Sequence, residues 1–293
     1  MDVVRFRGGL GNQMFQYAFL KGLEAKGRKV GASLGFYKEH PELMQFELDR
    51  VFPNIAMDIG YDKEFFDAYD KWCLIKADDE KVENFRKDLK NRYFWNEATE
   101  EGGNYQEDVY VTKECVFVGY WQTEKYFADI RQELLRDFQF SEGEKKLEVM
   151  KEKMLADNNH VSVHIRRGDY LDCPELYGGI CTEQYYKDAM QLVSQKVGNP
   201  VWVFFSDDIG WVKEHYRFGD NALYVEPSMF GQYQAWYDMC LMSCCSYNII
   251  ANSSFSWWGA WLNQRENRIV IAPRKWLNNR QRNDICPKNW IRV

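Results

Sequence analysis

The chain has 293 residues, of which 45% are apolar, 28% are charged and 16% are aromatic. This composition is typical of a globular protein of about two domains with enough apolar residues for a substantial core. The formal net charge of −6 argues against nucleic acid as a partner, so an anionic ligand must be bound by a local basic group. No apolar run approaches the roughly 18 residues that span a bilayer. We expect a cytoplasmic protein, at most peripheral to the inner face of the membrane.

The chain opens with a predicted strand, a glycine-rich turn and a helix. The apolar residues Val3, Val4 and Phe6 predict the strand, RGGLGNQ at 7–13 forms the turn, and 14–26 have helical spacing. The next strand is predicted over Lys29–Ser33. A dinucleotide fingerprint requires a third glycine where this chain has Met14, so nicotinamide or flavin use is not expected.

The glycines of this turn have a different predicted role. We expect Gly9 and Gly11 to let the backbone come close to a donor ligand, with the amide of Asn12 beside it. The alternative is a tight turn with an asparagine cap, which turn chemistry alone also favours.

The stretch from Phe36 to Glu114 is the least regular part of the sequence. Asp62–Trp72 and Asp79–Trp95 have the spacing of charged amphipathic helices, and a strand is predicted over Val116–Gly119. We expect this insertion to shape the acceptor site. The charged stretch 141–159 contains the predicted domain boundary, which divides the chain into an acceptor-side α/β domain at 1–150 and a donor-binding domain at 151–293.

The second half alternates regularly between strands and helices. This order predicts a doubly wound parallel sheet, in which polar residues that follow the strands gather at one edge. The predicted strands are Val161–Ile165, Val201–Phe205, Ala222–Val225, Asn248–Ala251 and Ile269–Ala272.

The first polar cluster follows Val161–Ile165 in the sequence HIRRGDY. His164 and Arg166 share one face of the predicted strand, and Arg167 and Asp169 lie in the turn after it. Adjacent arginines at a carboxyl edge suit a phosphate group because each offers a forked set of donors. The competing interpretation is a surface ion pair that closes the turn.

Two further clusters follow the neighbouring strands. A carboxylate of Asp207 or Asp208 is able to accept hydrogen bonds from adjacent N–H groups of a base, which favours guanine over adenine; one of the two is expected to cap a helix. The last cluster opens a helix whose N–H groups and dipole attract anions. Its expected phosphate-binding residues are Ser253, Ser254, Phe255 and Ser256.

The sequence carries no pattern for a metal site. A D-x-D motif does not occur, and the 8 cysteines and 4 histidines show no metal-ligand spacing. We therefore expect neither a metal nor a cofactor, with arginines and a helix end in place of a metal at the diphosphate.

Five motifs together resemble the bacterial α-1,2-fucosyltransferases of glycosyltransferase family 11. They are GGLGNQMFQYA, GYWQTEKYF, HIRRGDY, SDD and NSSFSWWGAW, in this order. The resemblance implies a GT-B fold with two Rossmann-like domains that face each other across a cleft, GDP-L-fucose as donor, and metal-independent transfer with inversion.

The resemblance also implies roles for single residues. His164 and Arg166 would contact the diphosphate, Asp207 would lie by the guanine, and the serines at 253–256 would hold phosphate. Asn12 would face donor and acceptor from the other domain. Arg166 and Asn12 are accordingly the expected catalytic residues.

The expected reaction is displacement of GDP from L-fucose by the 2-hydroxyl of a terminal galactose in an oligosaccharide or surface glycan. Asp2, Asp169, His164 and several loop carboxylates are all open as the general base. The alternatives are another linkage, acceptor or GDP-sugar, or a binding module without turnover. The sequence does not predict the oligomeric state.

Overall fold

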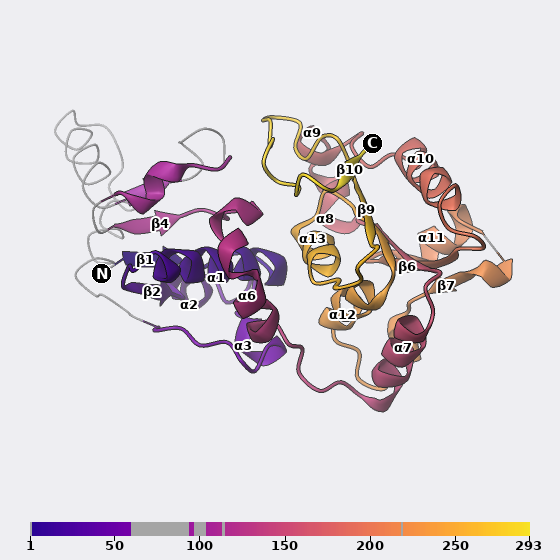
Figure 1. Cartoon of the computed structure of the whole chain (residues 1–293), viewed down its shortest axis with the longest axis horizontal. Coiled ribbons are helices and arrows are strands. Elements are labelled where there is room, and N and C mark those ends of the chain that lie inside the picture. The colour runs from indigo at the N-terminus through magenta and orange to yellow at the C-terminus, as the bar shows by residue number, and fades with distance from the viewer. Residues whose placement is uncertain (1, 60–93, 97–103, 113–114, 218) are drawn as a thin grey trace. The chain divides into compact units, whose positions relative to one another are not determined.

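The chain divides into two α/β units, with the boundary between Gln139 and Phe140. The computed structural model describes residues 2–59, 94–96, 104–112, 115–217 and 219–293 (Figure 1). Each unit contains a sheet of parallel strands. The α/β class and the two Rossmann-like units expected of a GT-B enzyme are therefore confirmed.

The first unit is built on a parallel sheet with the strand order β2-β1-β4-β3 over the described residues. Its strands are β1 (Asp2–Arg5), β2 (Val30–Ser33), β3 (Phe94–Asn96) and β4 (Val116–Val118). Its helices are α1 (Leu10–Ala25), α2 (Gly35–Glu39), α3 (Leu48–Val51) and α6 (Arg131–Asp137).

Buried aromatic rings hold α1 to the segment that follows β4. Phe19 of α1 stacks on Trp121 with 4.1 Å between ring centroids, and both side chains are fully buried. Trp121 adopts a φ of 55°, a left-handed conformation that costs a non-glycine residue free energy. The buried stack stabilises the turn in that conformation, so Trp121 has the core role that aromatic residues most often have.

The second unit contains a parallel sheet with the described strand order β10-β9-β8-β5-β6-β7. Its strands are β5 (His160–Ile165), β6 (Val201–Ser206), β7 (Ala222–Tyr224), β8 (Tyr247–Ile249), β9 (Ile269–Ala272) and β10 (Ile291–Arg292). Its helices are α7 (Lys145–Ala156), α8 (Gly168–Asp172), α9 (Pro174–Tyr177), α10 (Glu183–Ser194), α11 (Ile209–His215), α12 (Trp236–Cys244) and α13 (Ser254–Trp261).

The two faces of the β5 strand are covered by different helices. Val163 and Ile165 belong to one apolar cluster with Tyr186 of α10 and Val212 of α11. On the opposite face, the amide nitrogen of Asn248 donates both to the Ser162 hydroxyl (2.7 Å) and to the backbone oxygen of Met242 in α12 (2.8 Å). Figure 1 shows α12 and α13 on this second side of the sheet.

The boundary between the units falls earlier than the predicted one at residue 150. The reason is α7, which packs on α12 of the second unit and buries Leu147, Met150 and Met154. The predicted boundary lies within this charged stretch, whereas three apolar side chains at helical spacing make α7 part of the second core.

The predicted insertion helices fall largely outside the described residues. Asp62–Trp72 lies there entirely, as does Asp79–Trp95 up to residue 93. At its end the prediction is wrong, because Phe94–Asn96 is strand β3, which pairs with β4. Strand pairing with a buried neighbour overrode the helical spacing of the local sequence.

Candidate functional site

The polar clusters after β5, β6 and β8 lie at one edge of the second sheet. All three strands are parallel, and β5 lies between the other two. In the register of β5 with β8, Val163 lies opposite Ile249. Three residues farther along each chain, Arg166 and Asn252 leave this edge side by side.

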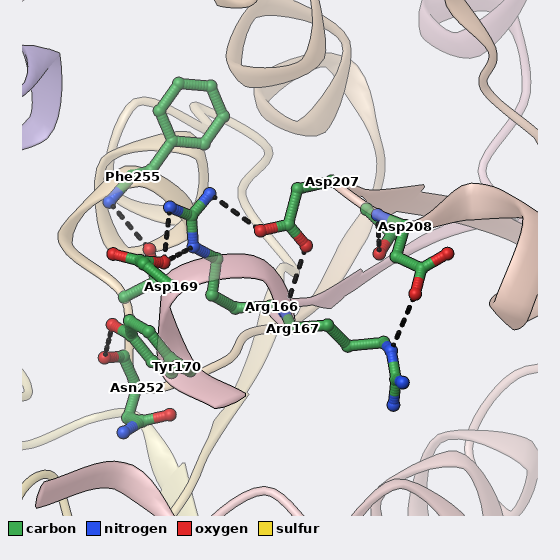
Figure 2. A network of polar contacts seen from close by, with 10 residues as sticks. Arg166, Arg167, Asp169, Tyr170, Asp207, Asp208, Asn252 and Phe255 are labelled. Atoms are coloured by element: carbon green, nitrogen blue, oxygen red, sulfur yellow. Dashed lines mark hydrogen bonds and ion pairs between the residues drawn. The ribbon is translucent and has the colours of Figure 1, made fainter. Parts of the chain in front are cut away.

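The guanidinium of Arg166 lies between two carboxylates (Figure 2). Its Nη2 is 2.7 Å from Oδ1 of Asp169, and its Nη1 is 3.1 Å from Oδ2 of Asp207. Gly168 keeps this arrangement open, because a Cβ at that position would lie only 2.5 Å from the same Asp207 oxygen. The ion pair that the sequence left as an alternative is thus present, and it fixes the direction of the Arg166 side chain.

Asp207 is engaged entirely by the arginine segment. Its Oδ2 pairs with Arg166, and its Oδ1 accepts a 2.9 Å hydrogen bond from the backbone N–H of Arg167. The side chain therefore positions the two arginines.

Asp208 has a separate structural role. It caps α11 by accepting a hydrogen bond from the backbone N–H of Trp211, and its other oxygen pairs with Nε of Arg167 at 3.0 Å. Arg167 in turn lies over the Trp211 ring, 3.8 Å from the centroid. Asp208 is thus the capping residue of the pair, and Arg167 is fixed by a carboxylate and an indole together.

Tyr170 connects the clusters after β5 and β8. Its hydroxyl donates a 2.8 Å hydrogen bond to the backbone oxygen of Asn252, and its ring lies 5.8 Å from the Arg166 guanidinium carbon. The Asn252 amide donates to the backbone oxygen of Trp276. These contacts hold the two strand ends in one rigid edge.

The segment after Asn252 opens α13 as predicted. Ser253 is the N-cap, and its hydroxyl accepts a hydrogen bond from the backbone N–H of Phe255. The Ser256 hydroxyl donates to the backbone oxygen of Ser253 and is fully buried, whereas Ser254 is partly exposed. Of the expected phosphate-binding side chains, Ser256 is therefore turned into the helix packing and Ser254 is accessible.

His164 is buried next to the start of α13. It is 4% exposed, its ring centroid lies 6.1 Å from that of Phe255, and its Nδ1 has no hydrogen-bond partner among the described residues. Burial, reinforced by the positive charge of Arg166, lowers its pKa to about 3. The imidazole is therefore neutral at physiological pH, so it can act as a hydrogen-bonding group without adding positive charge.

A pocket of about 160 Å³ adjoins the arginines. Its walls include Arg166, Arg167, Tyr170, Trp211 and Asn252. Both arginines thus border this recess.

The glycine-rich turn of the first unit also follows a strand end. Gly9 precedes α1 and Gly11 is buried in its first turn. Oδ1 of Asn12 accepts a 2.8 Å hydrogen bond from the amide of Gln122, which comes from the segment after the neighbouring strand β4. Asn12 is therefore fixed by a side-chain amide, a partner that the sequence did not identify.

The contacts of three site residues were not predicted from the sequence. Tyr170 and Asn252 lie within the motifs HIRRGDY and NSSFSWWGAW, but the hydrogen bond from the Tyr170 hydroxyl to the Asn252 backbone and the position of the Trp211 ring beside Arg167 depend on tertiary contacts. Within the described ranges, no group of three or more His, Cys, Asp and Glu side chains is arranged to hold a metal ion. The helices that the structure describes include none long and apolar enough to cross a membrane.

Comparisons with known proteins place this site in a family context. The chain is 35% identical to an alpha-1,2-colitosyltransferase of Escherichia coli, over 99% of this chain and 98% of that protein. It is 25% identical to the mouse galactoside 2-alpha-L-fucosyltransferase Sec1, over 89% of this chain and 64% of that protein.

A solved structure of the NodZ alpha-1,6-fucosyltransferase is also similar, with a TM-score of 0.47 and 14% identity over 92% of this chain and 94% of that one. At this TM-score the similarity adds nothing to what the strand order already shows. The family description Glycosyl transferase family 11 matches residues 84–293, which include every polar cluster of the second sheet edge. Together with the full-length similarity to the colitosyltransferase, this match shows that the chain belongs to glycosyltransferase family 11.

Proposed function

We propose that the protein transfers a 6-deoxy-L-sugar from a GDP-sugar to the 2-hydroxyl of a terminal galactose, with inversion and without a metal. The observation that carries the proposal is the arrangement at the second sheet edge. There the Arg166 guanidinium and the first turn of α13 follow adjacent parallel strands. A guanidinium and free helix N–H groups together form a site for a diphosphate.

Arg166 is the proposed catalytic residue at the departing nucleotide. As the bond from sugar to phosphate breaks, negative charge grows on the β-phosphate, and a guanidinium already held in place stabilises it. Asp169 and Asp207 hold Arg166 through contacts of 2.7 and 3.1 Å. The side chain therefore needs little reorganisation when the donor binds.

Three of the candidates for the general base differ in how well they can accept a proton. Asp2 is buried, and both of its carboxylate oxygens accept hydrogen bonds from Arg28 at 2.5 and 2.7 Å. His164, with a pKa lowered to about 3, is too weak a base to take a hydroxyl proton efficiently. Asp169 remains exposed beside Arg166, and an oxocarbenium-like transition state requires little base assistance.

Two donor sugars are candidates. L-Fucose follows from the sequence motifs, and the name of the E. coli relative, matched over nearly the full chain, favours colitose. Colitose is L-fucose without its 3-hydroxyl group, so both sugars offer the same 6-deoxy face and the same leaving GDP. Galactose as acceptor is the proposal that the fucosyltransferase relatives support.

The test is a transfer assay with GDP-L-fucose and GDP-colitose against lactose, N-acetyllactosamine and a type-1 disaccharide, followed by linkage analysis. We expect one donor to give an α-1,2-linked product and Arg166→Lys to lower kcat by about 100- to 1,000-fold. A lysine cannot reach both carboxylates and a phosphate. Because Arg166 is one-third exposed, we expect the melting temperature of the Arg166→Lys variant to differ little from that of the wild type. Binding of GDP-sugars without GDP release would instead favour a binding module.

A further inference from the structure

Asp238 is a buried carboxyl group that the proposed mechanism does not yet use. It lies in the first turn of α12, is 8% exposed, and its Oδ1 has no hydrogen-bond partner among the described residues. Among the described residues, the hydroxyl of Tyr233 is within hydrogen-bonding reach of its carboxyl group. A buried carboxyl oxygen without a donor is costly, and such groups occur preferentially where a ligand supplies the missing partner.

The packing of α12 on α13 places Asp238 at the level of the α13 N-terminus. Both helices start at the carboxyl edge of a parallel sheet and run back toward the amino edge, so they are parallel to each other. A Cβ on Gly259 of α13 would lie 2.9 Å from the Cβ of Met242 in α12. Four residues earlier on each helix, about one turn, Asp238 lies level with Phe255.

His164 reaches the same level from the sheet. It lies two residues after Ser162, so it projects from the face that Asn248 connects to Met242 of α12. Its ring approaches Phe255 at 6.1 Å. Two buried side chains, each with a polar atom that has no partner in the described part of the chain, thus lie beside the first turn of α13 on the α12 side of the sheet.

From this geometry we infer that Asp238, and not Asp207, is the carboxylate that reads the guanine base of the donor. The inference rests on the proposed function, which supplies the GDP-sugar. Guanine offers two adjacent donors, N1–H and the 2-amino group, to a carboxylate, and its O6 accepts a hydrogen bond from a neutral imidazole such as His164. Asp207 is a poor candidate because both of its oxygens are engaged by Arg166 and by the Arg167 backbone.

The test compares the affinities of GDP and inosine diphosphate, which lacks the 2-amino group, by calorimetry. We expect the wild type to prefer GDP by about tenfold to 100-fold, the value of a hydrogen bond to a charged group. Asp238→Asn should lose most of this preference. The matched variant Asp207→Asn should weaken both nucleotides equally and keep the preference, because it disturbs the arginines that bind phosphate.

The outcomes separate the inference from the proposed function. A preference that survives Asp238→Asn, or that Asp207→Asn alone abolishes, overturns the inference, as does a wild type that binds both nucleotides equally. A wild type that binds neither nucleotide contradicts the proposed function itself. Should Asp238→Asn not fold, Tyr233→Phe removes only the hydroxyl that holds the carboxylate; it should reduce the preference, and an unchanged preference overturns the inference.

Discussion

Arg166 illustrates how a single residue can be both an ion pair and a binding group. In isolation, a contact between a partly exposed arginine and carboxylates stabilises a protein by at most about 1 kcal/mol. Here Asp169 and Asp207 approach the guanidinium from two sides, and Gly168 leaves room for the second of them. We infer that the carboxylates serve orientation more than stability.

At the same scale, His164 makes folding stability depend on pH. Its pKa is lowered to about 3 by burial and by Arg166, whereas an unfolded histidine titrates near 6.5. Below pH 6.5 the unfolded chain therefore binds a proton that the folded protein does not, so the contribution of His164 to stability falls as the pH falls toward 3. The loss is at most about 1.4 kcal/mol per pH unit.

The measurement is urea unfolding of the wild type and His164→Asn between pH 7 and pH 5. The free-energy difference between the two proteins should shrink as the pH is lowered. A constant difference for His164→Asn would contradict the buried neutral imidazole.

Asp238 makes folding stability depend on pH in the opposite direction, so its contribution must be separated from that of His164. Burial raises its pKa to about 7, so its carboxyl group disfavours the folded state increasingly as the pH rises from 3.8 to 7. The wild type and His164→Asn both contain Asp238, so its contribution cancels in the difference between their free energies of unfolding.

The sequence contained one signal for Asp238: it is the only charged residue in the stretch 233–249.

At the scale of elements, the turn between β1 and α1 depends on two glycines in different ways. Gly8 has a φ of 82°, and a Cβ there would lie 2.7 Å from the amide nitrogen of Asn12. Gly9 has an ordinary φ of −76°, and no atom lies within 4 Å of a Cβ placed on it. Gly8→Ala should therefore displace Asn12 from Gln122 and destabilise the protein by about 1–2 kcal/mol.

Gly9→Ala is the matched variant and should leave the melting temperature nearly unchanged. If a donor approaches the backbone at Gly9, as the sequence predicts, this variant should still lose transfer activity because the methyl group occupies the approach. Differential scanning fluorimetry and the transfer assay separate the two effects. Equal melting temperatures for the two variants would show that the left-handed turn is not what requires Gly8.

An element could be predicted from the sequence when its own residues determine its conformation. Val161–Ile165 alternates apolar and polar residues and Ile269–Ala272 is an apolar run, and the structure places strands there within a residue. β3 was missed because its conformation is imposed by pairing with β4, a partner distant in sequence. For the same reason the shared sheet edge could be predicted from strand order, whereas the ring contacts of Tyr170 and Trp211 could not.

At the scale of the whole molecule, each unit has the parts of an independent domain. The second unit has its own sheet and an apolar cluster that includes Val163, Tyr186, Phe204 and Ile271. The sequence predicted two domains because the strand pattern restarts at Val161. It misplaced their boundary, since the burial of α7 becomes visible only when its apolar side chains are seen against α12.

The fragment 140–293 is therefore expected to fold alone and to bind GDP without transferring sugar. It retains α7, whose Met154 sulfur lies 3.9 Å from the Cys245 sulfur and whose last turn accepts hydrogen bonds from Arg265. The matched fragment 151–293 lacks Leu147 and Met150, both buried. Removing two buried apolar side chains costs several kcal/mol, a large part of a domain's stability.

Urea unfolding followed by tryptophan fluorescence measures the difference between the two fragments. We expect a cooperative transition for 140–293 and an early or non-cooperative one for 151–293. GDP should raise the midpoint of the longer fragment, because a ligand that binds only the folded state stabilises it. If 140–293 failed to fold while the full chain unfolded in one step, the second unit would depend on the first for its stability, and the donor edge would need the whole chain to form.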